Sequence, residues 1–236
     1  MPGAIEQYHD MLARNGVAAE TQAALDDLQQ RRGITFGARP LCTVLRPRFT
    51  TVAAQRQLDM QMRPLLGAFA TALDAALTDT RVRAQFRLEP WEEELVMDDP
   101  GYLPASPLSR LDAFVMPGTG AMAITEYNAE TPAGPAFTDA LADIFVDLPA
   151  MRAFAPEYEC VAPPARPAVL RVLLDAFSQW SRGRAMPRIV ILDWAEVPSS
   201  REFALFAEYF TSRGLSCIIS DPRNAEYRGG TLYCDG

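Results

Sequence analysis

The chain has 236 residues, of which 49% are hydrophobic and 22% are charged. This balance is ordinary for a globular protein with a real core and argues against global disorder. The formal net charge of −8 repels phosphate backbones, so nucleic acid is not an expected partner. Because no long apolar run and no secretory signal pattern are present, we expect no membrane association and a cytoplasmic location.

Several reactive residue types are scarce. The sequence contains no lysine, which excludes a Walker-type phosphate loop, a Schiff-base lysine and a lysine general base within these residues. The single histidine, His9, argues against a Ser-His-Asp triad. The four cysteines are widely scattered without a C-x-x-C pair, so we interpret them as buried or incidental thiols rather than zinc ligands.

The first third of the chain is predicted to be mainly helical. Apolar spacing indicates a helical stretch over residues 4–31, which Gly33 ends. Residues 35–51 mix β-branched residues with prolines and are interpreted as a strand or an extended arm. A long helix is expected over residues 52–77, kinked or split by Pro64.

A β-hairpin is predicted in the middle of the chain. A short helix begins at Pro90, because proline suits the first helical turn, and a proline-rich connection follows over residues 97–109. The apolar period then changes to two, which indicates a strand over 111–116 and a returning strand over 121–128. The sequence Pro-Gly-Thr-Gly at 117–120 forms the turn between them.

Two further helices are expected after the hairpin. The first covers residues 137–145 and the second covers residues 169–182, with a proline-rich linker over 155–167 between them.

The last part of the chain is predicted to be a right-handed βαβ unit with a parallel sheet. An apolar strand over 188–193 precedes a helix over 202–213, and a second strand covers 215–220. Ser199 and Glu202 have the spacing of a capping box at the start of this helix. Beyond it, Gly229-Gly230 indicates a turn before a strand over 231–234.

The predicted fold class is therefore mixed α/β, with a helical N-terminal region, a hairpin and a βαβ domain. We expect one domain over residues 1–150 and a second over 168–236. The chain ends on Asp235-Gly236, a dipeptide that usually starts a hairpin turn, so we expect the second domain to be truncated at its C-terminus.

Polar side chains gather at the open end of the predicted hairpin. Strand alternation places two sets of side chains on a shared face: Ile124, Glu126 and Asn128 on one strand, and Arg110, Asp112 and Phe114 on the other. If the hairpin closes at its turn, a cation, two carboxylates and an amide converge at one edge.

This set of groups has two interpretations. Hard oxygen ligands such as Glu126 and Asn128 suit Mg²⁺, which completes its shell with water and substrate phosphates. Arg110 is able to hold a phosphate or carboxylate with two hydrogen bonds, and the helix start after Thr131, at Gly134, offers backbone N–H groups to an anion. The simpler alternative is a structural salt bridge between Glu126 and Arg110.

Three blocks of the sequence carry a family resemblance: SRLDAFV, ITEYNAETPAGPAFTDALADIF and IVILDW followed by SSREFALFAEYFTSRG. Together they resemble the circularly permuted ATP-grasp family, which includes relatives of glutathionylspermidine synthase and of eukaryotic-type glutathione synthetase. The R-x-D and E-x-N patterns are the specific part, while LRPRFTT and GGTLYCDG resemble further blocks. The likeness extends from about Gly33 to the last residue.

The resemblance implies roles for individual residues. Glu126 and Asn128 match positions that bind Mg²⁺ and the ATP phosphates, and Arg110 matches a substrate-binding, catalytic arginine. Asp112 fits the family pattern beside it. By the same resemblance, the predicted hairpin corresponds to a portion of the ATP-grasp domain, and the predicted βαβ unit resembles the pre-ATP-grasp domain.

The implied activity is an ATP- and Mg²⁺-dependent carboxylate-amine ligase. ATP phosphorylates a small-molecule carboxylate, and an amine or a peptide attacks the acyl-phosphate to form an amide. Family members normally continue into strands that carry ATP-binding lysines, so we expect this chain to be an N-terminal portion, inactive on its own. The alternative is a non-catalytic binding or scaffold module of the same fold. A dehydrogenase fragment is excluded, because no G-x-G-x-x-G follows the strand over 188–193.

Overall fold

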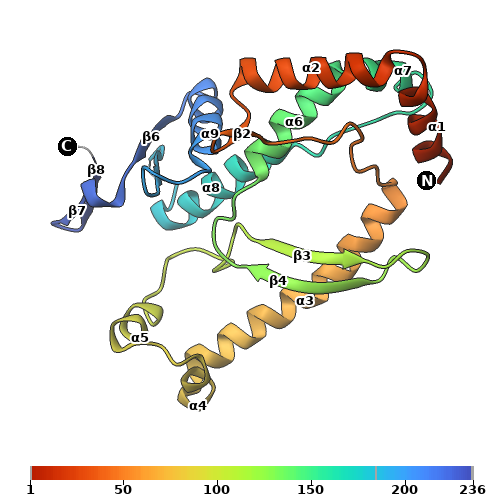
Figure 1. Ribbon diagram of the computed structural model, residues 1–236. Coiled ribbons are helices and arrows are strands. Elements are labelled where there is room, and N and C mark those ends of the chain that lie inside the picture. Colours follow the sequence, from red (N-terminus) through yellow and green to blue (C-terminus); the bar gives the residue numbers. More distant parts are fainter. Residues whose placement is uncertain (1, 184, 235–236) are drawn as a thin grey trace. The chain divides into compact units, whose positions relative to one another are not determined.

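A computed structural model describes residues 2–183 and 185–234, in which helices and short strands alternate along the chain (Figure 1). The predicted mixed α/β class is confirmed. Every sheet within the described residues has two strands. No helix in this part of the chain combines the length and the apolar character needed to cross a membrane.

The chain packs into two compact units, each built from separated segments. Unit 1 comprises Met1–Phe49, Ala133–Leu174 and Ala185–Gly236, and unit 2 comprises Thr50–Pro132 and Asp175–Arg184. The predicted ranges 1–150 and 168–236 divide the chain differently, because they do not treat unit 2 as an insertion between parts of unit 1.

Unit 1 begins with two helices where the sequence predicted a single helical stretch. Helix α1 (Pro2–Ala13) and helix α2 (Val17–Arg32) are separated at Gly16, whose φ of 85° is left-handed and suits glycine. Gly33 ends α2 as predicted, in a left-handed conformation with its N–H bonded to carbonyls of the last turn. The arm that follows contains only a short ladder between β1 (Thr35–Phe36) and β2 (Arg39–Pro40).

Three further helices precede the last segment of unit 1. They are α6 (Pro135–Asp147), α7 (Pro149–Phe154) and α8 (Ala165–Ser181), of which α8 ends in unit 2. Helix α7 was not predicted. The proline-rich linker is shorter than predicted, because α8 begins at Ala165.

The hydrophobic core of unit 1 is centred on aromatic rings. Phe154 is 1% exposed, and its ring stacks on Phe49 at 5.0 Å and on Tyr158 at 4.4 Å between centroids. Tyr8, which is fully buried, meets the Phe154 ring edge-on at 5.3 Å. Its hydroxyl donates to the carbonyl of Leu45 at 3.0 Å, so the buried polar atom is satisfied.

The predicted strand, helix and strand with parallel pairing are confirmed. Strand β5 (Arg188–Leu192) pairs in parallel with β6 (Ser216–Ser220), and α9 (Ser200–Ser212) connects them. Strands β7 (Ala225–Arg228) and β8 (Thr231–Cys234) then form a hairpin through the two glycines. The turn expected at residues 235–236 lies outside the described residues.

The predicted capping box at the start of α9 is wrong. Ser199 makes no side-chain capping hydrogen bond, and Glu202 faces away from it into the protein. The Glu202 carboxylate is 1% exposed and accepts hydrogen bonds from the Gly134 N–H at 2.8 Å and the Ala136 N–H at 2.9 Å. It therefore caps the N-terminus of α6, a helix distant in sequence, where negative charge is favoured.

Asp139 repeats this arrangement one helix further on. Its carboxylate is largely buried and accepts from the N–H groups of Ala165 at 2.7 Å and Arg166 at 2.8 Å, at the start of α8. The Arg166 Nε also donates to it at 3.1 Å. We call Glu202 and Asp139 the trans-capping carboxylates, because each completes the first turn of another helix.

Unit 2 contains the long helix α3 (Val52–Thr78), followed by α4 (Thr80–Arg83), a 3-10 turn η1 (Ala84–Phe86) and α5 (Pro90–Val96). Pro64 does not split α3. Thr51 caps α3 by accepting from the Ala54 N–H at 3.0 Å. Ala76, which is 7% exposed, is the only buried residue among the described residues of this unit.

Candidate functional site

The predicted hairpin forms in unit 2. Strand β3 (Arg110–Val115) pairs antiparallel with β4 (Met122–Asn128), and the Pro-Gly-Thr-Gly loop joins them as expected. The N–H of Met116 bonds to the carbonyl of Ala121 at 2.8 Å and closes the loop. The polar end of the hairpin is therefore the end opposite the loop.

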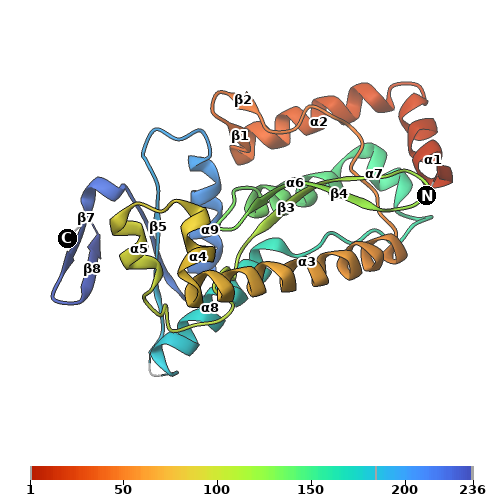
Figure 2. The same ribbon diagram turned by 90° about the horizontal axis from the view of Figure 1, so that it is seen from below.

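Helix α3 lies beside the hairpin and contacts one of its faces (Figure 1; Figure 2). Gln57 donates to the carbonyl of Thr119 at 2.9 Å, and Gln61 donates to the carbonyl of Gly120 at 2.9 Å. At the other end of the strands, the rings of Phe69 and Tyr127 stack at 4.4 Å. The face that carries Tyr127 is thus directed toward α3, and the opposite face is open.

The open face carries the four predicted polar residues at opposing positions. Arg110 pairs across the strands with Asn128, and Asp112 pairs with Glu126. Directly opposed residues project on the same side of an antiparallel sheet. We call these four residues the site quartet. Their predicted convergence is confirmed by the register, whereas their chemical roles stay predictions.

A β-bulge at Thr125 corrects one detail of the predicted face. The register shifts between Asp112 and Ala113, so that Ile124 pairs with Ala113 and not with a position on the quartet face. The prediction that Ile124 shares a face with Glu126 was therefore wrong, because it assumed unbroken alternation along the strand. The Thr125 hydroxyl fills the irregularity by donating to the carbonyl of Asp112 at 2.9 Å.

Arg110 and Asp112 form a bidentate pair within the quartet. The Arg110 Nε lies 2.8 Å from Asp112 Oδ1, and Nη2 lies 3.2 Å from Oδ2. These hydrogen bonds hold the pKa of Asp112 below its ordinary value, with smaller contributions from its contacts with Glu126 and Asn128. The guanidinium is thereby fixed in direction beside the second carboxylate.

The Asn128 amide lies near Asp112 but is not fully paired. Its Nδ2 is buried and makes no hydrogen bond of normal geometry within the described residues. Buried polar groups are nearly always paired, so this amide is a site where an additional acceptor would be favoured. The oxygen atoms of Asp112, Glu126 and Asn128 are hard ligands of the kind that Mg²⁺ prefers. The chemistry of the donor set therefore fits magnesium.

The two remaining predicted residues lie beyond the hairpin and have different surroundings. Thr131, in unit 2, has a φ of 23°, which is unusual for a β-branched residue and often marks a functional segment. Gly134 belongs to unit 1, and its N–H donates to Glu202. The anion expected at this helix start is thus the protein's own carboxylate, which argues against a phosphate contact at Gly134.

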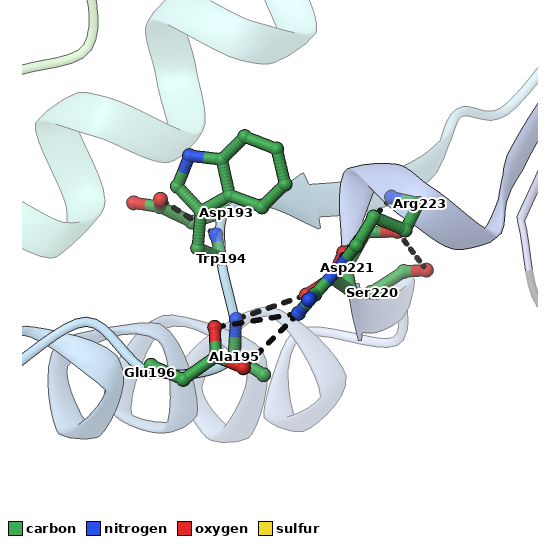
Figure 3. Close-up of polar contacts among 7 residues, drawn as sticks. All are labelled: Asp193, Trp194, Ala195, Glu196, Ser220, Asp221 and Arg223. Atoms are coloured by element: carbon green, nitrogen blue, oxygen red, sulfur yellow. Dashed lines mark hydrogen bonds and ion pairs between the residues drawn. The ribbon is translucent and has the colours of Figure 1, made fainter.

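A second polar cluster lies in unit 1 at the carboxyl ends of β5 and β6 (Figure 3). Asp221 accepts from the Ala195 N–H at 3.0 Å and pairs with Arg223, which also reaches Glu196 at 3.2 Å. Arg223 keeps the pKa of Asp221 far below its ordinary value. The guanidinium lies 5.5 Å from the Trp194 ring centroid.

Sequence analysis did not identify this second cluster. The rule that ligands approach the carboxyl ends of parallel strands would have directed attention to Asp193 and Asp221, which follow the two strands. Asp221, however, binds the chain's own donors on both sides, which ties the loop after β5 to the loop after β6. We therefore interpret the cluster as a structural closure of these loops.

Comparisons with known proteins assign neither a family nor a function to this chain. No family model matches this chain, and no curated protein matches it. Within residues 2–183 and 185–234, no group of three or more histidine, cysteine, aspartate or glutamate side chains is arranged to hold a metal ion. Any magnesium site at the quartet therefore has at most two carboxylates, together with the Asn128 amide, to draw on.

Proposed function

We propose that this chain contributes the metal- and phosphate-binding part of an ATP- and Mg²⁺-dependent carboxylate-amine ligase. The observation that carries the proposal is the site quartet, which gathers Arg110, Asp112, Glu126 and Asn128 on one open face. The resemblance of the R-x-D and E-x-N blocks to circularly permuted ATP-grasp enzymes supports the same activity. The ATP-grasp-like identity of the hairpin and the pre-ATP-grasp-like identity of the βαβ unit are each part of this proposal.

Stability alone does not account for the quartet. Asp112 and Glu126 lie directly opposite each other, and like charges in this position destabilise a sheet. The compensating ion pair is weak, because Arg110 and Asp112 are 44% and 36% exposed and ion pairs at the surface are screened by solvent and contribute little to stability. A hairpin selected only for stability would not retain two facing carboxylates.

The quartet divides into two chemical functions. Glu126 and the Oδ1 of Asn128 would supply the oxygen ligands for Mg²⁺, and the bound ion would neutralise charge on the transferred phosphoryl group. Asp112 orients Arg110 through their bidentate pair, and the guanidinium binds the negative charge of the substrate carboxylate or the phosphate. The Asn128 Nδ2, which makes no hydrogen bond of normal geometry within the described residues, would donate to a phosphate oxygen.

The substrates follow from the reaction class. ATP transfers its terminal phosphoryl group to a small-molecule carboxylate and leaves as ADP. A small amine or a peptide amine then attacks the acyl carbon, and inorganic phosphate and a proton are released as the amide forms. The backbone at Thr131, three residues beyond Asn128, has an unusual positive φ. We assign this segment to contact with the ATP phosphates.

Calorimetric titration of the chain with ATP, with and without Mg²⁺, tests the proposal directly. We expect Mg²⁺-dependent binding that Glu126→Gln weakens about tenfold or more, since the substitution removes a charged contact. Glu130→Gln is the matched control, because Glu130 is an exposed acid on the same segment. The melting temperatures of both variants should stay close to that of the original chain.

A non-catalytic module of the same fold is the second candidate. It is favoured by Glu202, which occupies the helix start where a phosphate was expected. Absence of Mg²⁺-dependent ATP binding by the folded chain would select this alternative, and equal binding by the Glu126→Gln variant would show that the quartet is structural.

A further inference from the structure

An exposed aromatic ring lies on the same face as the site quartet. Phe114 follows Asp112 by two residues on β3, so both side chains project toward the open side of the hairpin. The Phe114 side chain is 70% exposed. Its partner across the strands is Ala123, whose methyl group leaves the Phe114 ring uncovered.

We propose that Phe114 is the stacking platform for the planar heterocyclic base of the nucleotide whose phosphates bind the site quartet. This inference rests on the proposed function and assigns to it a residue that determines nucleotide affinity. The ligand is a nucleoside triphosphate carried as its magnesium complex.

The spacing along β3 suits such a ligand. Arg110 and Phe114 are four residues apart, which corresponds to about 13 Å at the rise of an antiparallel strand. An extended nucleoside triphosphate covers a comparable span between its base and its terminal phosphate. The phosphates would lie over the quartet while the base reaches Phe114 along the same strand.

The open face has a charged end and an apolar end, as a nucleoside triphosphate does. The two carboxylates and one guanidinium of the quartet carry a net negative charge, which one Mg²⁺ makes positive and thus complementary to a polyphosphate. Around Phe114 the face is apolar and small, with Ala123 opposite and Met116 half exposed beyond it. An aromatic face of this kind binds any planar base through stacking.

Paired titrations with Mg·ATP and Mg·tripolyphosphate separate the base from the phosphates. We expect Phe114→Ala to weaken Mg·ATP binding by about tenfold and to leave Mg·tripolyphosphate binding unchanged. Phe114→Trp should restore ATP affinity. Phe86→Ala serves as the control, because Phe86 is an exposed phenylalanine of the same unit outside the hairpin.

The possible outcomes distinguish this inference from the proposed function. If both ligands bind and Phe114→Ala changes neither affinity, the platform is wrong while the quartet stands. If Phe114→Ala weakens both ligands equally, the ring supports the hairpin rather than a base, which also overturns the inference. If the original chain binds neither ligand, the proposed function fails and the platform fails with it.

Discussion

The two units of this protein are stabilised by different means. Unit 1 encloses an aromatic core around Phe154 and joins its helices through the buried trans-capping carboxylates. Ala76 is the only buried residue among the described residues of unit 2, and two glutamines and one aromatic stack hold the hairpin on α3. The candidate site lies in unit 2. Segments with few buried contacts open most easily, which suits a face that has to admit a ligand.

The largest expected effect concerns the aromatic core. Phe154→Ala should lower the free energy of unfolding by roughly 3–5 kcal/mol, because it opens a cavity between rings that pack at about 5 Å. Urea denaturation measures the change. Phe86→Ala in unit 2 is the contrast, with an expected change within about 0.5 kcal/mol because its ring is 59% exposed. Comparable losses in the two variants would contradict the distinction between the units.

The next effect concerns a trans-capping carboxylate. Glu202→Gln should cost roughly 1–3 kcal/mol, because the amide retains only one acceptor oxygen for the Gly134 and Ala136 N–H groups and loses the charge that favours the start of α6. Thermal unfolding gives the comparison. Glu208→Gln is the matched variant, since Glu208 lies on the same helix and is exposed. A Glu202→Gln protein as stable as the Glu208→Gln protein would show that the cap contributes nothing.

The smallest expected effect is a dependence of the stability on pH, caused by Tyr8 in the core of unit 1. Burial raises the pKa of Tyr8 to about 12 from its ordinary value of 10.0. The neutral phenol is therefore favoured by folding, and its contribution is complete below pH 10 and is lost as the pH rises toward 12. Tyr8→Phe should remove this alkaline loss and cost roughly 1 kcal/mol at neutral pH, from the hydrogen bond to Leu45. Stability measured at pH 7 and above pH 10 for both proteins checks this, and an unchanged alkaline slope in the variant would contradict it.

Local patterns predicted much of the fold. The change from helical to alternating period located the hairpin of β3 and β4, and a four-residue turn fixed its loop. Because register follows from loop closure, the opposition of Arg110 to Asn128 and of Asp112 to Glu126 could also be predicted. The parallel pairing of β5 with β6 followed from a strand, a helix and a second strand in a short span.

Long-range and irregular features could not be predicted in this way. The spacing of Ser199 and Glu202 favoured a local capping box, whereas the carboxylate binds a helix start that lies far away in the sequence. The bulge at Thr125 leaves no mark in residue spacing, so the side chain of Ile124 was placed on the wrong face. Strand alternation predicted which face of the hairpin carries Phe114. It could not predict that the ring stays exposed, because exposure depends on how the whole chain packs.

The trans-capping carboxylates make the start of one helix depend on the presence of another. The N–H groups at the start of α6 are satisfied by Glu202 only when α9 is in place, and those at the start of α8 are satisfied by Asp139 of α6. The three helices should therefore exchange their amide hydrogens as one cooperative block, although they are separated by long stretches of sequence. A polypeptide chain synthesised only as far as residue 200 would contain α6 without its cap, so this block can be completed only after Glu202 has emerged.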